Sequence, residues 1–477
     1  MIKLALKNKV VKNFSILTIS NLLIQVLSIL SSIRLARELQ PAGYGLFNLI
    51  SVQASVFSII AAYGLRIVII RHIARKRDDA RKIFKLSNNI RFVTTFIAIV
   101  VAIIYNLLQP SAKLSVVLLI SLSVLIVFQT FWDTIESLSF GFEKMEATGI
   151  INFVFTIIWV CEVYILPKAS FTVTILVYTY VLNQLLKSLV YYWWINKSIL
   201  KKQPTVGNMT FNDHKELILQ SNFYFILAVF TAVQNQLPVL FLQFNSTMDQ
   251  IGLFNLGYRI ISPLQMVLNV LLTALFPMFS RLAIEDRELF GKRIKTLLNI
   301  IIFIGIWGCL CFALFSKDVV HLLYGVRYLV SVKVIIIQCW YTVLFAIFCI
   351  IGTVLNSLDK QKLLSIISII SGVIATPIFY YQSRFGAIGL AWAFVITAFV
   401  NMTYPWAILL KLVKNQISIT YTILIFSILG ILVWSTSYYS FEWSFIIRLG
   451  ISIILTFVIF YYLYKIEFKK LNATAQP

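Results

Sequence analysis

The five residues GLFNL occur twice in this 477-residue chain, at Gly45–Leu49 and again at Gly252–Leu256. The two copies lie 207 residues apart, and each leads into a long apolar run. A second pair of segments, FEKMEATG and SLDKQKLLS, aligns Glu143-Lys144 with Asp359-Lys360 at an offset of 216. Loop insertions account for the small change in offset. The sequence therefore predicts that one half of the protein is a copy of the other.

The composition is that of a membrane protein. Hydrophobic residues make up 60% of the chain and charged residues 12%, with a mean hydropathy of +0.89. A soluble domain carries about 45–50% apolar and about 25% charged residues. The five cysteines all lie inside apolar runs and lack the spacing of a disulfide framework or a zinc site. We therefore interpret them as buried hydrophobes and expect no metal and no cofactor.

Runs of about 20 apolar residues, the length that crosses a bilayer as a helix, occur along the whole chain. Because helices satisfy every backbone polar group within lipid, these runs predict an all-α polytopic membrane protein. Fourteen spans are expected, at residues 14–35, 44–70, 88–109, 114–138, 147–166, 171–196, 219–243, 251–278, 296–315, 332–356, 362–381, 385–410, 417–437 and 443–464.

Lysine and arginine gather in alternate loops, which predicts the orientation. With both termini in the cytoplasm, segments such as RHIARKRDDARKIFK, GKRIK and KIEFKK lie inside, while the outer loop FNSTMDQ carries no base. The net charge of +23 then follows from this inside bias and from attraction to anionic membrane lipids, so no nucleic-acid partner is expected.

Six spans separate the two GLFNL copies, so both halves have the same orientation. This is a parallel repeat, related by an axis along the membrane normal, as in several transporters. The predicted division is a six-helix lobe at 1–200, a second at 201–415, and an accessory helix pair with a cytoplasmic tail at 416–477. Two such lobes would enclose a central cavity, where transporters bind their substrates.

The stretch LARELQPAGYGLFNLISV, residues 35–52, resembles the entry to the second span of the polysaccharide (O-antigen type) flippases. These belong to the multidrug/oligosaccharidyl-lipid/polysaccharide exporter superfamily, whose fold has twelve core helices. FGAIGLAWAFVI at 385–396 is similar to the family's glycine-rich entry to span twelve, whereas Gln40 stands where the family often has glycine. The resemblance implies a flippase that moves a polyprenyl-pyrophosphate-linked oligosaccharide from the cytoplasmic to the outer leaflet of a bacterial plasma membrane, for surface polysaccharide export.

Basic residues within the spans are candidate substrate ligands, because a charge in the bilayer core costs a few kcal/mol. A lipid pyrophosphate crossing hydrocarbon needs fixed cations, and Arg and Lys supply them. The candidates are Arg34, Arg66, Lys187 and Arg259. Arg66 could instead snorkel to the cytoplasmic surface, and Arg34 could be an interfacial anchor paired with Glu38.

Other polar residues within the spans suggest further roles. Asp133 and Glu136 share a helix face and could couple transport to H⁺ or Na⁺, or form a solvated interfacial pair. Gln234, Asn235 and Gln236 could line a cavity for sugar hydroxyls or hold helices together, and the following Pro238 predicts a helix break.

The entry motifs contain a proline and several glycines, and we assign them a structural role. Pro41 sets a turn, while Gly43, Gly45 and Gly252 allow close backbone packing.

Two other functions remain open. A multidrug or cation antiporter of the same superfamily would need carboxylates in its cavity, whereas bases outnumber deep acids here. A membrane enzyme of glycan assembly would need catalytic motifs, but the outer loops are short and no catalytic residues are identified. We expect a transporter rather than an enzyme, in contact with its lipid-linked oligosaccharide and membrane lipids. A polysaccharide polymerase or export machinery is a further candidate partner.

Overall fold

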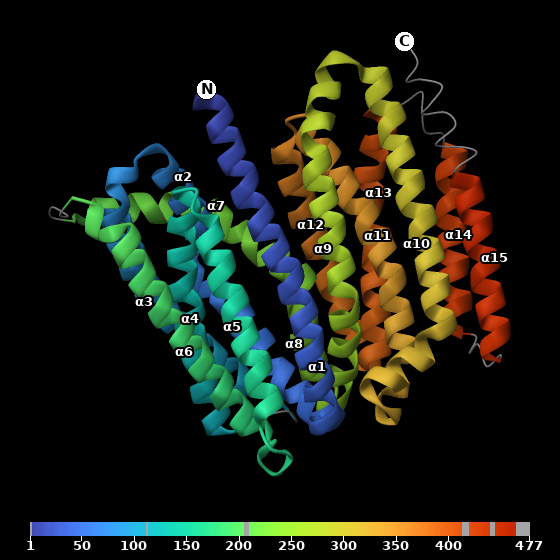
Figure 1. The fold of residues 1–477 in the computed structure, drawn as a ribbon, viewed down its shortest axis with the longest axis horizontal. Coiled ribbons are helices and arrows are strands. Elements are labelled where there is room, and N and C mark those ends of the chain that lie inside the picture. The colour runs from blue at the N-terminus through green and yellow to red at the C-terminus, as the bar shows by residue number, and fades with distance from the viewer. Residues whose placement is uncertain (1, 111–112, 205–208, 413–418, 439–443, 464–477) are drawn as a thin grey trace. The chain divides into compact units, whose positions relative to one another are not determined.

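A computed structural model describes residues 2–110, 113–204, 209–412, 419–438 and 444–463. Over these residues the fold consists of helices joined by short connections (Figure 1). The first eight α-helices are α1 (Ile2–Ala62), α2 (Leu65–Arg75), α3 (Ala80–Leu107), α4 (Val116–Gly141), α5 (Met145–Ile165), α6 (Val173–Ser198), α7 (Phe211–Asn235) and α8 (Leu237–Asn245).

The remaining α-helices are α9 (Met248–Glu285), α10 (Arg287–Tyr324), α11 (Val332–Ser357), α12 (Gln361–Gln382), α13 (Gly386–Leu412), α14 (Ile419–Tyr438) and α15 (Phe445–Leu463). Five short 3₁₀ helices lie between them: η1 (Arg77–Asp79), η2 (Lys168–Ser170), η3 (Leu200–Lys202), η4 (Val326–Ser331) and η5 (Ser383–Phe385). The predicted all-α membrane architecture is confirmed. The predicted cytoplasmic tail lies outside the described residues.

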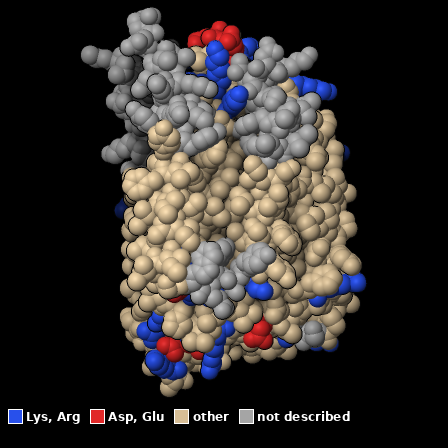
Figure 2. All heavy atoms as spheres, turned by 90° about the vertical axis from the view of Figure 1, so that its right-hand side faces the viewer, with Lys and Arg blue, Asp and Glu red and all other residues tan. Residues whose placement is uncertain are grey.

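Within the described residues, ten helical segments are long and apolar enough to cross a membrane. Two of them, Leu17–Ala62 and Gln361–Lys411, each cover two predicted spans, and two shorter apolar helices, Phe426–Thr436 and Phe445–Tyr461, match the last pair. Figure 2 shows one face on which a wide uncharged band separates two rims that carry Lys, Arg, Asp and Glu. Such a band is the surface that a lipid bilayer covers.

α1 contains two helical stretches joined at Gln40, whose φ of 59° and ψ of 174° are non-helical, and the chain reverses direction there (Figure 1). The predicted second span, residues 44–70, begins after this reversal and is itself interrupted. After α1, Tyr63 and Gly64 adopt positive φ and separate it from α2. α7 crosses at this break, because Tyr63 stacks on Phe225 with 4.7 Å between ring centroids. Packing of α7 therefore divides a segment that hydropathy treats as continuous.

The chain forms two compact units, Met1–Gly252 and Leu253–Pro477. In the first, a core cluster joins α2, α3, α4, α6 and α7. In the second unit, α10 and α11 are hydrogen-bonded to the accessory helices α15 and α14. Trp307 Nε1 donates to Thr456 Oγ1 of α15 at 2.9 Å, and Trp340 Nε1 donates to Thr436 Oγ1 of α14 at 2.8 Å. The functional lobe boundaries predicted after residues 200 and 415 stay a prediction.

Helix bounds repeat between the halves with a constant offset. α4 and α11 begin 216 residues apart, at Val116 and Val332, and end 216 apart, at Gly141 and Ser357. α5 and α12 begin at Met145 and Gln361, again 216 apart. The duplication inferred from short sequence matches therefore extends to whole helices.

The turns between these helices are also the same. Glu143 has a φ of 59° and Asp359 a φ of 57°, a left-handed conformation that ends many helices. The amide of Lys144 donates to Ser139 O at 2.8 Å, and the amide of Lys360 donates to Leu355 O at 2.9 Å, so both turns close with the same six-residue hydrogen bond. The aligned junctions thus share backbone geometry as well as residue type.

The two GLFNL glycines meet in a reciprocal contact. A Cβ added at Gly45 would lie 2.0 Å from Met248 O, and one added at Gly252 would lie 2.1 Å from Pro41 O. Each contacted carbonyl belongs to the residue four positions before the opposite glycine. Only glycine permits this approach of two helix backbones. The duplicated motif is therefore a helix crossing, and Pro41 and Gly43 belong to the same entry.

We expect Gly45→Ala and Gly252→Ala each to reduce the free energy of unfolding by about 1–3 kcal/mol or more, because the new methyl overlaps a carbonyl oxygen. Thermal unfolding of the purified protein in detergent measures the effect. Gly308→Ala on α10 is the matched control, because a Cβ there meets nothing within 4 Å. Equal stability of all three variants would show that the crossing is not close-packed.

Candidate functional site: a buried ion-pair network

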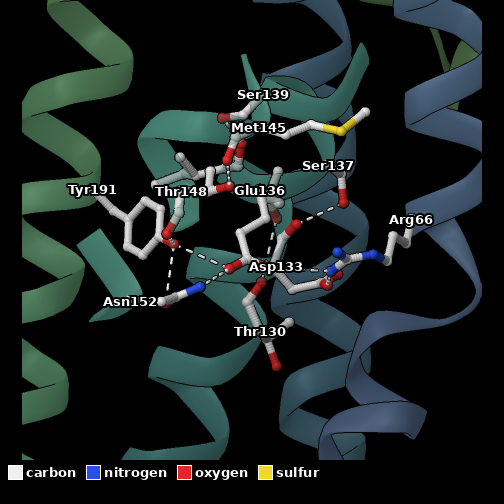
Figure 3. A network of polar contacts seen from close by, with 12 residues as sticks. Arg66, Thr130, Asp133, Glu136, Ser137, Ser139, Met145, Thr148, Asn152 and Tyr191 are labelled. Atoms are coloured by element: carbon white, nitrogen blue, oxygen red, sulfur yellow. Dashed lines mark hydrogen bonds and ion pairs between the residues drawn. The ribbon is translucent and has the colours of Figure 1, made fainter. Parts of the chain in front are cut away.

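Arg66, Asp133 and Glu136 of the first unit meet in one network of polar contacts (Figure 3). Arg66 lies in the first turn of α2, just after the break at Gly64. Its guanidinium forms ion pairs with both carboxylates of α4: Nη1 contacts Asp133 Oδ1 and lies 3.3 Å from Glu136 Oε2. Asp133 and Glu136 are three residues apart and present both carboxylates to one side of the helix. The structure thus joins a predicted substrate ligand to the two predicted coupling residues.

A second arginine, which the sequence analysis did not identify, completes the contacts of Asp133. Arg91 of α3 lies 2.7 Å from Asp133 Oδ2 through Nη2, and its Nη1 donates to Thr130 O at 2.7 Å and Thr134 Oγ1 at 2.8 Å. Its side chain is 3% exposed, against 36% for Arg66. Arg91 stands three residues inside the predicted span 88–109, so the rule that selected the other bases could have found it.

Glu136 is held from the opposite side by two neutral donors. Asn152 Nδ2 of α5 donates to its Oε1 at 2.9 Å, and Tyr191 Oη of α6 donates to the same oxygen at 3.0 Å. Lys187, one turn before Tyr191, places its ammonium 4.3 Å from the centroid of the Trp132 ring. A cation over an indole face is stabilised by the ring quadrupole. Four helices beyond α2 therefore contribute to the network.

The charges of this network do not cancel. Arg66, Arg91 and Lys187 are opposed by Asp133 and Glu136, which leaves one positive charge in excess. The arginines form ion pairs with carboxylates, whereas the Lys187 ammonium lies over the rings of Trp132 and Tyr191 and close enough to Glu136 to be stabilised by its charge.

Two predicted substrate ligands lie outside this network. Arg34 Nη2 donates to Leu166 O at 2.8 Å, and its guanidinium covers the ring of Tyr164. Glu38, the expected partner of Arg34, lies instead 3.8 Å from Lys168. Arg259 belongs to the second unit, on α9, and is partly exposed. The roles of Arg34, Arg66, Lys187 and Arg259 in binding substrate stay predictions.

The expected helix break at Pro238 is confirmed, because α7 ends at Asn235 and α8 begins at Leu237. Asn235 is exposed and its side chain donates to Thr231 O of its own helix at 2.8 Å, while the side-chain oxygen of Gln236 is buried without a hydrogen bond among the described residues. The proposed cavity-lining role of Gln234, Asn235 and Gln236 stays a prediction.

A buried amide cluster forms about two helical turns beyond this break. Gln53 Nε2 of α1 donates to Gln243 Oε1 of α8 at 2.8 Å, and Asn106 Nδ2 of α3 donates to Gln53 Oε1 at 2.9 Å. Tyr105 donates from its hydroxyl to Leu240 O at 2.9 Å. These contacts fix α8 against α1 and α3, so amide groups act here as links between helices.

The apolar helices and their buried charges define a multi-pass membrane protein. A family model described as polysaccharide biosynthesis protein matches residues 10–283, more than half of the chain. The chain therefore belongs to the polysaccharide biosynthesis protein family, and the resemblance drawn from residues 35–52 is confirmed. A curated relative from Klebsiella pneumoniae, described as an uncharacterized membrane protein in the cps region, is 21% identical over 422 residues, which cover 88% of this chain and 86% of the relative.

Two solved structures show that the fold is shared with transporters. The lipid II flippase MurJ in an inward closed conformation matches with a TM-score of 0.66 and 15% identity, over 94% of this chain and 98% of that one. An inward-facing multidrug resistance MATE family transporter of the MOP superfamily matches with a TM-score of 0.62 and 16% identity, over 82% and 96%. The predicted MATE-like architecture is thereby confirmed.

We expect Asp133→Asn to reduce the free energy of unfolding by about 3–5 kcal/mol, because it leaves the buried Arg91 guanidinium without its carboxylate. Chemical unfolding in detergent micelles measures the change. Glu288→Gln is the matched control, because Glu288 pairs with Lys292 on the surface and such pairs contribute about 0–1 kcal/mol. Adding Arg91→Met to Asp133→Asn should restore part of the loss, and additive losses would contradict the pairing.

Proposed function

We propose that this protein is a flippase that moves a polyprenyl-pyrophosphate-linked oligosaccharide from the cytoplasmic to the outer leaflet of the plasma membrane by alternating access. Family membership supports a role in polysaccharide assembly. The observation that carries the proposal is the network of Arg66, Arg91 and Lys187 with Asp133 and Glu136, whose surplus charge is positive. A pyrophosphate needs fixed cations of this kind, since its charge cannot cross hydrocarbon alone.

The contacts suggest how the network would receive the anion. Asp133 bridges Arg66 and Arg91, and Arg91 is almost completely buried. The Asp133–Arg91 pair is therefore the rigid part of the network. Arg66 is more exposed and holds Glu136 at 3.3 Å. The pyrophosphate would approach Lys187 and Arg66 and compete with Glu136 for the guanidinium. Arg34 and Arg259 would then act at other stages of the passage rather than in this network.

Competition for Arg66 would leave Glu136 without its cation, in a buried position held by Asn152 and Tyr191. A buried carboxylate without a cation is costly, and uptake of H⁺ or Na⁺ would relieve the cost. This is the physical basis for a coupling role of Glu136 and, through Arg66, of Asp133.

We expect Glu136→Gln to make transport independent of an imposed proton or sodium gradient, because the amide keeps its hydrogen bonds but cannot take up a cation. Proteoliposomes with and without each gradient measure the dependence, and Glu288→Gln serves as the surface control. A gradient dependence unchanged in Glu136→Gln would exclude this residue as the coupling group.

The function itself is tested in liposomes that carry a fluorescent short-chain polyprenyl-pyrophosphate oligosaccharide, with leaflet transfer followed by quenching from outside. We expect transfer by the wild-type protein and a roughly 10- to 100-fold slower rate in Lys187→Ala, as loss of a charge-assisted contact worth about 1.5–3 kcal/mol implies. Lys187→Arg should retain most activity, and Lys292→Ala is the surface control.

Transfer that survives Lys187→Ala would keep the function and remove Lys187 from the site. Absence of transfer by the wild-type protein would contradict the flippase proposal. Uptake of organic cations in the same liposomes would then identify the multidrug antiporter function, for which Asp133 and Glu136 would have to leave their arginine partners.

A further inference from the structure

The internal repeat assigns an equivalent in the second half to four residues of the ion-pair network. At the offset of 216 that relates α4 to α11 and α5 to α12, Asp133 corresponds to Cys349, Glu136 to Gly352 and Asn152 to Ser368. At the offset of 207 that relates Gly45 to Gly252, Arg66 corresponds to Thr273. None of these four counterparts carries a charge at neutral pH.

All four counterparts line one cavity of about 730 Å³ between α9, α11 and α12. The same places are thus filled by guanidinium and carboxylate groups in the first unit and left open in the second. The replacements are smaller than the residues they match, and Gly352 has only Leu364 methyl carbons, at 3.8 and 3.9 Å, within 4 Å of an added Cβ. The cavity is therefore lined by the small neutral residues that replace the ion-pairing residues of the first unit.

The lining of this cavity mixes apolar side chains with amides and hydroxyls, and among the described residues it carries no charged side chain. Thr273 and Thr353 donate their hydroxyl protons to backbone carbonyls four residues earlier, at 2.7 and 2.9 Å, which leaves their oxygens as acceptors. Asn269 and Asn356 supply amide donors, and Phe348 adds an aromatic surface. The cavity therefore offers donors, acceptors and a flat apolar patch together.

This chemistry selects one class of ligand. A pyrophosphate would need cations, a metal ion would need carboxylates, and a purely apolar chain would place hydrocarbon against the amides of Asn269 and Asn356. A sugar presents hydroxyls that both donate and accept, and its C–H faces pack on aromatic rings. The volume lies within the roughly 300–1,000 Å³ of small-molecule sites.

We propose that the cavity between α9, α11 and α12 binds the uncharged sugar residues of the lipid-linked substrate. This inference rests on the proposed function. The cavity lies within the second unit and offers a neutral site for the glycan, whereas the charged network of the first unit offers cations for a pyrophosphate.

The test compares two probes that differ only in sugar: a short-chain polyprenyl pyrophosphate, and the same lipid carrying a neutral N-acetylglucosamine disaccharide. Binding is measured on the full-length protein in lipid nanodiscs. We expect the wild-type protein to bind the glycosylated lipid at least tenfold more tightly than the bare lipid. Asn356→Leu and the cavity-filling Gly352→Leu should abolish this difference and leave binding of the bare lipid unchanged. Gly308→Leu, also a glycine-to-leucine change in the second unit, should keep the difference.

Cys349 provides a measurement that requires no change to the cavity. In a Cys161→Ser/Cys311→Ser background, alkylation of Cys349 by a small maleimide should slow at least fivefold with the glycosylated lipid and not with the bare lipid. Bare-lipid binding without any gain from the sugar, and without protection of Cys349, would overturn this inference and leave the proposed function standing. Failure of the wild-type protein to bind either lipid would overturn both.

Discussion

A charge among membrane-spanning helices requires a partner of opposite sign, and Asp133 supplies that partner for two arginines on different helices. Its two oxygens face Arg66 and Arg91, so that α2, α3 and α4 are joined at one carboxylate. Replacing a buried network of this kind by apolar residues is often neutral or stabilising, so stability alone is a weak reason for its presence. Its surplus positive charge supports the proposed role in binding an anion.

The sequence was informative where local rules decide the structure. Apolar run length predicted the spans, and the repeated motif predicted the duplication. Sequence also showed that Arg66, Asp133 and Glu136 lie within spans, but not that they contact one another, because the pairing depends on how α2 packs against α4. Arg91 was missed because it lies near a predicted span end, where bases are usual. The sequence suggested an ion pair between Glu38 and Arg34, one helical turn away, whereas in the fold Glu38 pairs with Lys168, which is distant in sequence.

The duplicated halves kept their backbone and changed their chemistry. Both retain the left-handed residue that ends the fourth helix of each half, at Glu143 and Asp359, and both contribute a glycine to the motif crossing. Between these constant points, positions that hold ions in the first half hold small neutral residues around a cavity in the second. Duplication can thus preserve helices and turns while the two units acquire unlike chemistry.

The accessory helices have a mechanical consequence. Trp340 of α11 is hydrogen-bonded to α14, and Trp307 of α10 is hydrogen-bonded to α15. Arg448 of α15 also donates to Leu314 O of α10 at 2.9 Å. Any rotation of the second unit would therefore carry the apolar face of α15, including the exposed Phe457, through the surrounding lipid. Tilting such a helix changes the hydrophobic thickness that it matches. The balance between conformations would then depend on the length of the lipid acyl chains, which rates in bilayers of graded thickness would reveal.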